Sequence, residues 1–159
     1  MPIAKRVARA RKFRGALVCK TVPQTIDRTS DGYVTFEAED PSYDCVGIHD
    51  RNTNNSRLTV PNETRRVRLT ANLCLANAAD FYRAEIQKNR AASFFGLPRV
   101  NISKSPDVRT VVNMVSAPLV VTPGDYFEVK VSTNLPPNAP GVVVDSTWPD
   151  TWFAMELLD

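Results

Sequence analysis

The stretch RRVRLTANLCLA, residues 65–76, alternates between two kinds of side chain over almost its whole length. Every second residue from position 67 to position 75 is apolar, and the residues between them are mostly charged or polar. In a β-strand this period of two places the apolar residues on one face, whereas a helix would scatter them around its axis. The pattern predicts a half-buried strand. Its apolar residues are Val67, Leu69, Ala71, Leu73 and Leu75.

Shorter segments with strand character occur before and after this stretch. They are separated by turn residues, including many of the twelve prolines, at intervals of roughly eight to twelve residues. Such spacing predicts an all-β sandwich or jelly roll. We expect 81–89 and 91–95 to form a hairpin across Asn89-Arg90. The other expected strands are 15–21, 33–39, 43–49, 109–117, 118–121, 122–133, 142–147 and 151–158.

Two of these segments also alternate with a period of two, which predicts two faces for each strand. The residues of 33–39 on one face are Val34, Phe36 and Ala38, and those on the other are Tyr33, Thr35 and Glu37. The residues of 122–133 on one face are Phe127, Val129 and Val131, and those on the other are Tyr126, Glu128 and Lys130.

The size and composition of the chain indicate one globular domain. It has 159 residues, of which 43% are hydrophobic, and no apolar run approaches the roughly 20 residues that cross a bilayer. The first residues contain no apolar stretch typical of a signal peptide, so we expect synthesis in a cytoplasm and no membrane association. Cys19, Cys45 and Cys74 lack metal-binding or disulfide spacing, and we interpret them as reduced thiols.

Charge divides the chain into two parts. Residues 1–14 contain six cations and no acid, while the remaining residues carry 14 basic and 17 acidic groups. We therefore predict a basic arm, 1–14, and a slightly acidic β domain, 15–159. We expect the arm to dock on an acidic protein surface, with nucleic-acid contact or a solvated or trimer-packed segment as alternatives. Its candidate docking residues are Lys5, Arg6, Arg9, Arg11, Lys12 and Arg14.

His49, the only histidine, lies near Asp44 and Asp50 and raises the question of a metal site. A metal needs three or four converging ligands, and in a strand Asp44 and His49 would point to opposite faces. We therefore favour a polar loop stabilised by asparagine turns over a metal site, and we predict no cofactor.

No catalytic motif stands out in the sequence. A nucleophile–histidine–acid arrangement would have to use His49, and no GxSxG elbow, P-loop or GxGxxG is present. The acidic residues lie mostly at expected strand ends and turns, where carboxylates are usually solvated. We therefore predict that the protein is not an enzyme.

The order of several fragments resembles the C1q/TNF-like jelly-roll superfamily, and more narrowly its modules in virion proteins of tailed bacteriophages and phage-like particles. These fragments are VTFEAEDPSYDCVGIHD, NNSRLTVPNETRRVRLTANLCLA, EIQKN, SAPLVVTPGDYFEVKV and TWFAMELLD, and together the resemblance covers about residues 15–159. Asn89-Arg90 replaces the family's frequent Asn-Gly, Phe153-Ala154 replaces Phe-Gly, and residues 1–14 contain no Gly-X-Y repeat of a collagen stalk.

The resemblance implies a homotrimer of jelly rolls whose contacts come from an aromatic and aliphatic sheet face. Candidate interface residues are Phe94, Phe95, Trp152 and Phe153, for each of which packing in the subunit's own core is the alternative.

It also implies a structural virion protein, such as a trimeric spike, fibre base or decoration protein, that binds capsid, portal or tail proteins through the arm. The alternative function is a receptor- or glycan-binding module that uses loops 50–57, 97–107 and 134–141. Trp148 and Trp152 would then stack on the sugars of a host surface glycan. A secreted TNF-type signalling ligand is a third class, which the missing signal peptide disfavours.

Overall fold

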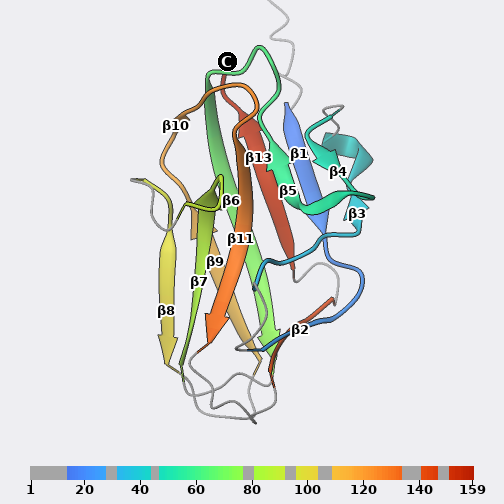
Figure 1. Cartoon of the computed structure of the whole chain (residues 1–159), viewed down its shortest axis with the longest axis vertical. Helices are drawn as coiled ribbons and strands as arrows, with labels where there is room; N and C mark the ends of the chain where they lie inside the picture. Colours follow the sequence, from blue (N-terminus) through green and yellow to red (C-terminus); the bar gives the residue numbers. More distant parts are fainter. Residues whose placement is uncertain are drawn as a thin grey trace, which may run out of the picture.

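The computed structural model describes residues 14–27, 32–43, 47–76, 81–91, 96–103, 109–133, 141–146 and 151–159. The strands of this part of the chain form two antiparallel sheets that lie one in front of the other in Figure 1. The predicted all-β sandwich is therefore confirmed. Within the described residues, no helix has the length and apolar character needed to span a membrane.

The larger sheet has eight strands, with the order β2-β12-β6-β13-β1-β3. Strands β9 and β10 both pair with β6, on the side opposite to β12 and β13. The bounds are β1 Gly15–Cys19, β2 Gln24–Ile26, β3 Ala38–Glu39, β6 Arg66–Ala76, β9 Thr110–Val115, β10 Leu119–Val120, β12 Val142–Val144 and β13 Trp152–Leu157.

The smaller sheet has five strands, with the order β4-β5-β11-β7-β8. In Figure 1 it lies toward the viewer, with β11 and β7 in front of β6 and β9. The bounds are β4 His49–Asp50, β5 Asn54–Thr59, β7 Phe81–Lys88, β8 Arg99–Ser103 and β11 Tyr126–Thr133, and a 3-10 turn, η1, covers Pro41–Tyr43.

Strand β6 follows its predicted alternation closely. Its five apolar residues at odd positions from 67 to 75 are all completely buried, while Arg66 and Arg68 are exposed. The same strand forms ladders with β13 and β12 on one side and with β9 and β10 on the other. Its inner face packs against β11 of the other sheet, where Phe127, Val129 and Val131 are also fully buried. These two strands supply the centre of the core.

The segment predicted as a strand over 33–39 instead crosses from one sheet to the other. The Val34 N–H donates to the Val129 carbonyl in the five-stranded sheet at 2.9 Å, and the Glu37 N–H donates to the Cys19 carbonyl in the eight-stranded sheet at 3.1 Å. Val34 and Phe36 are fully buried, so the predicted alternation is correct. The regular strand is shorter than predicted because one segment cannot keep its hydrogen bonds to both sheets.

The predicted hairpin partner of β7 was wrong. Strand β7 pairs with β8, from Phe81 opposite Ser103 to Glu85 opposite Arg99, and residues 92–95 lie outside the described part. A tight turn does occur at Asn89-Arg90, with φ angles of 51° and 57°. Positive φ at both central residues is typical of a type I′ turn and costs arginine more than it costs asparagine or glycine. Of the strand predicted over 43–49, only the end enters β4, and residues 44–46 are not described.

The chain enters β1 beside its own C-terminal residues. The Leu157 N–H donates to the Arg14 carbonyl at 2.7 Å, and the Arg14 guanidinium donates to the Asp159 main-chain oxygen at 2.9 Å. Residues 1–13, which hold the other five candidate docking cations, lie outside the described residues. The basic arm therefore stays a prediction, although the place where it would leave the domain is known.

We expect Leu73→Ala to lower the free energy of unfolding by about 2–5 kcal/mol, because it removes a fully buried side chain from the middle of β6. Urea denaturation followed by circular dichroism measures the effect. The control is Arg68→Ala on the exposed face of the same strand, which should cost about 1 kcal/mol or less. Equal losses in the two variants would contradict the assignment of β6 to the centre of the core.

Candidate interaction surfaces

Exposed aliphatic side chains gather at one edge of the eight-stranded sheet. Val111, Val115 and Val120, on β9 and β10, are 55%, 59% and 76% exposed. Among the described residues only one other large hydrophobic side chain is exposed, that of Val22. Single exposed valines are ordinary on protein surfaces, but three on two neighbouring short strands form a patch.

The strand registers extend this patch across the outer face of the sheet. Residues directly opposite each other on paired strands share a face. Leu17 lies opposite Ala154, Ala154 opposite Thr70, and Thr70 opposite Val115. Trp152 lies in the next row of the same face, beside Asn72 and Asn113. We call this surface the valine face; its apolar members are Leu17, Val111, Val115, Val120, Trp152 and Ala154.

The valine face ends at an open edge. In the described part of the chain β9 pairs with β6 alone, and β10 does the same, so each presents unpaired backbone groups on its other side. An apolar edge of this kind is an aggregation hazard unless something covers it. Charges, prolines and bulges usually protect such edges, but β9 has the sequence TVVNMV, with neither charge nor proline.

The predicted interface residues have different positions. Trp152 is partly buried and belongs to the valine face. Phe153 is fully buried in the subunit, with its ring centre 6.0 Å from that of Phe36, which is the core alternative considered for it from the sequence. Phe94 and Phe95 lie outside the described residues. The valines of β9 and β10 were not among the predicted residues, although their alternation with buried Val112 and Met114 is visible in the sequence.

His49 forms structural hydrogen bonds. Its Nδ1 lies 2.8 Å from a Glu39 carboxylate oxygen and its Nε2 lies 3.2 Å from the Asn55 carbonyl oxygen. The histidine side chain is only 1% exposed. Each ring nitrogen of His49 therefore already faces a hydrogen-bonding partner within the protein.

The acidic neighbours of His49 do not converge on it. An Asp50 carboxylate oxygen accepts the N–H groups of Asn52 at 2.9 Å and Thr53 at 3.2 Å, and these bonds lower the pKa of that carboxyl. The polar turn predicted from the sequence is present, but the Asp50 side chain bonds its backbone N–H groups, where asparagine side chains were expected, and Asn54 and Asn55 belong to β5. Asp44 lies outside the described residues, among which no group of three or more histidine, cysteine or acidic side chains could hold a metal ion.

The described cysteines are unsuited to nucleophilic chemistry. Burial, with a smaller contribution from Asp40, raises the pKa of Cys19 to about 12, so its thiol stays protonated at neutral pH. Cys19 contributes to a shallow apolar recess whose wall also includes Thr21, Ala38 and Pro41. Cys74 is buried as well, and Cys45 is not described.

The predicted ligand loops are only partly described. Much of the loop expected over 50–57 belongs to β5. Residues 104–108, 134–140 and Trp148 lie outside the described part. Trp152 lies within β13 and not in a loop.

A buried carboxylate on the outer face of the five-stranded sheet was missed by sequence reasoning. Glu128 has the expected outward register, opposite Arg57 and Gln87, yet it is completely buried. Its oxygens accept Ser56 Oγ at 2.6 Å, Arg57 Nε at 3.3 Å and Arg90 Nε at 2.9 Å. A buried carboxylate needs such partners because desolvation is costly.

A second, mostly buried carboxylate continues this network. Glu85 accepts Arg99 Nε and Gln87 Nε2, each at 2.6 Å, and the Gln87 side-chain oxygen accepts the Tyr33 hydroxyl at 3.0 Å. No local signal marks Glu85 or Glu128 as buried, because their partners come from distant parts of the chain.

Comparisons with known proteins support the fold. No protein-family model and no curated protein matches the chain. Solved structures that are similar include Eiger TNF from S. frugiperda, with 13% identity, 94% of each chain covered and a TM-score of 0.61. They also include the globular domain of the zebrafish complement 1qA protein, with 12% identity, 92% of this chain and 98% of that chain covered, and a TM-score of 0.58. The chain therefore has the C1q/TNF-like jelly-roll fold, as predicted.

We expect Glu128→Gln to weaken the dependence of stability on acid. Burial alone would raise the pKa of Glu128, but the bonds from Arg90 and Ser56 and the charge of Arg90 outweigh it and hold the pKa below its ordinary 4.5. A lowered carboxyl pKa stabilises the fold above the unfolded value, and this contribution is lost as pH falls through the folded value. The variant should therefore be less stable than wild type at pH 7 but closer to it at about pH 3.

Urea denaturation at both pH values measures this difference. Glu156→Gln is the control, because Glu156 is 38% exposed and pairs with an exposed arginine. A destabilisation by Glu128→Gln that is the same at both pH values would mean that Glu128 acts through packing alone.

Proposed function

We propose that this chain is a homotrimeric structural protein of the virion of a phage or phage-like particle. The valine face forms the contacts between subunits and the basic arm ties the trimer to another virion protein. The observation that carries the proposal is the apolar sheet face that ends, among the described strands, at an edge without a further pairing strand. It is combined with the order of sequence fragments typical of phage C1q-like modules.

The valine face has the chemistry of a subunit interface. Leu17, Ala154 and Val115 share one row of this face and Trp152 lies in the next, and neither row contains a charged residue. Charged residues follow toward the C-terminal end of β13: Arg68 pairs with Glu156 in the row between Val115 and Val120. Arg66, opposite Val120, pairs with Asp159. A central apolar area with a polar rim is typical of protein interfaces, and copies of one chain usually meet through closed symmetry.

The arm supplies the attachment. Five cations precede Arg14 within the first twelve residues, whereas the domain after residue 14 is slightly acidic. The arm would leave the domain next to Asp159, at the end of the sandwich where Arg14 meets the C-terminal residues. This position lets the sandwich project away from the surface that holds the arm. In this arrangement the protein acts by binding and spacing, without catalysis.

We expect wild type to sediment with three times the 17.7 kDa mass of one chain. Val115→Asp should shift it to monomer, because it places a charge on the valine face. Val22→Asp is the matched control, since Val22 is 57% exposed and lies off this face. Sedimentation equilibrium measures the masses. A monomeric wild type, or dissociation caused equally by Val22→Asp, would overturn the proposed interface.

The arm is tested by replacing its five leading cations, Lys5, Arg6, Arg9, Arg11 and Lys12, with serine while the chain length is kept. We expect the trimer to persist and association with particles to be lost. The measurement is quantitative mass spectrometry of density-purified particles from cells that make the protein. Absence of wild type from such particles would reject the virion role, and full retention of the serine variant would reject attachment by charge.

A further inference from the structure

The outer face of the five-stranded sheet concentrates positive charge. Register places Arg57, Lys130, Arg83 and Arg99 on this face, from four neighbouring strands, together with the carboxylates of Glu85 and Glu128. The Arg90 side chain reaches the same surface from the turn after β7, where it contacts Glu128. Five cations and two carboxylates give this face a formal charge of +3, although residues 15–159 as a whole carry −3.

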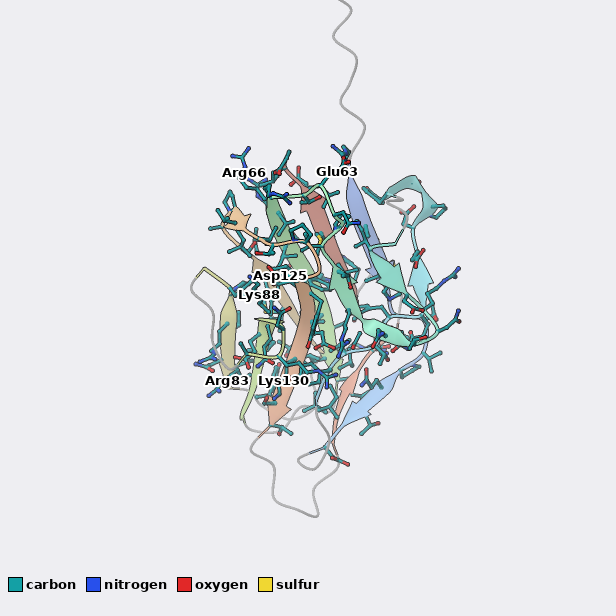
Figure 2. The ribbon with its side chains drawn as sticks, turned by 45° about the horizontal axis from the view of Figure 1, so that its top comes forward. Glu63, Arg66, Arg83, Lys88, Asp125 and Lys130 are labelled. Carbon is teal, nitrogen blue, oxygen red and sulfur yellow. The ribbon has the colours of Figure 1, made fainter. Side chains whose placement is uncertain are left out.

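The carboxylates lie beneath the cations. The Glu128 and Glu85 side chains are 0% and 8% exposed, whereas those of Arg90 and Arg99 are 43% and 41% exposed. An approaching ligand therefore meets guanidinium groups, and the acids that hold them are out of reach. Arg83 donates its Nε–H to Asn101 at 3.2 Å, and neither Arg83 nor Lys130 forms an ion pair within the described residues. Figure 2 shows these two side chains at the same end of the adjacent strands β7 and β11.

The cations are also held in place before any ligand binds. The Arg57 guanidinium lies 4.2 Å from the ring centre of Tyr126, and that of Arg90 lies 4.4 Å from the ring centre of Tyr33. The Lys130 ammonium lies 5.3 Å from the same Tyr33 ring. Cations fixed by stacking and by buried carboxylates lose little conformational freedom on binding, which favours affinity.

We propose that this surface, the cationic face, binds an acidic polysaccharide. Neighbouring strands lie about 4.8 Å apart and alternate residues of one strand about 7 Å apart, so the cations form a flat lattice suited to an extended chain with repeated acidic groups. Guanidinium groups bind carboxylates and sulfates through paired hydrogen bonds. Cations lie against the rings of Tyr33 and Tyr126 and leave less aromatic surface for base stacking, which favours a polysaccharide over single-stranded nucleic acid.

The cationic face lies on the opposite side of the sandwich from the valine face. The inference therefore does not depend on the proposed trimer. It goes beyond the proposed structural role, and it uses a surface different from the loops considered in the sequence analysis. If the trimer forms, three cationic faces point outward. Once one face has bound a long polysaccharide chain, the other two faces meet that chain at a high effective concentration, which strengthens the overall binding.

The test uses the full-length chain in which the five arm cations are already serine, so that the arm does not contribute. The probe is heparin, which carries sulfates and carboxylates, at about 0.1 M salt, where interactions over more than about 10 Å are screened. We expect binding by surface plasmon resonance and a loss of about tenfold or more in Arg83→Gln/Lys130→Gln, since each cation that meets an acidic group releases counterions.

The matched control is Arg66→Gln/Arg109→Gln, which removes the same charge from two 60% exposed arginines away from the cationic face. Arg66 begins β6 of the other sheet, and Arg109 directly precedes β9. Circular dichroism confirms the fold of both variants. No binding of heparin by the parent chain, or an equal loss in the control, overturns the proposal. Tighter binding of duplex DNA of equal charge than of heparin assigns the face to nucleic acid instead. Sedimentation of the same samples reports on the trimer separately, so failure of either proposal is recognised on its own.

Discussion

The packing of strand β6 between two sets of neighbours is the constraint on which the rest of the structure depends. Four strands take their register from its backbone, and its inner face supplies five fully buried side chains to the core. A slip of one residue would turn all five toward solvent and would present the outer face, with Arg66 and Arg68, to the core. The strict alternation of residues 65–76 excludes that slip, and through the ladders with β9, β10 and β13 it also sets the register of the valine face.

The sequence predicted what depends on local alternation and missed what depends on distant partners. The faces of β6 and β11 were correct because a period of two residues assigns each side chain independently of its neighbours. The alternation of 33–38 was correct as well, but its transfer between sheets was not, because hydrogen-bond partners such as Val129 are far along the chain. The turn at Asn89-Arg90 was predicted correctly because it depends on local backbone geometry. The strand that pairs with β7 was not, because it begins only at Arg99.

The candidate sites follow the same division. Sequence reasoning placed Glu128 on a polar face but could not foresee its complete burial, because Arg57 and Arg90 are 71 and 38 residues away. It considered Phe153 for an interface with core packing as the alternative, and only the packed sandwich shows that Phe153 lies against Phe36 in the core. The contacts of the Arg90 side chain also explain why an arginine occupies a turn position that is unfavourable for it. A positive φ is energetically less favourable for arginine than for glycine, and the contacts of Arg90 with Glu128 and Tyr33 offset this difference.

The pairing of Arg14 with Asp159 places both ends of the folded domain at one pole of the sandwich. The opposite pole is reached by the eleven residues of β6, a span of roughly 36 Å at 3.3 Å per residue. A tag or fused protein joined after Asp159 would therefore lie close to the surface that the N-terminal segment binds and would interfere with that contact. A short peptide bridge between the two ends, with new ends opened in a distal loop, would move such cargo to the far tip. A circularly permuted form of the domain would therefore display a fused protein at the end of the sandwich opposite to Arg14 and Asp159.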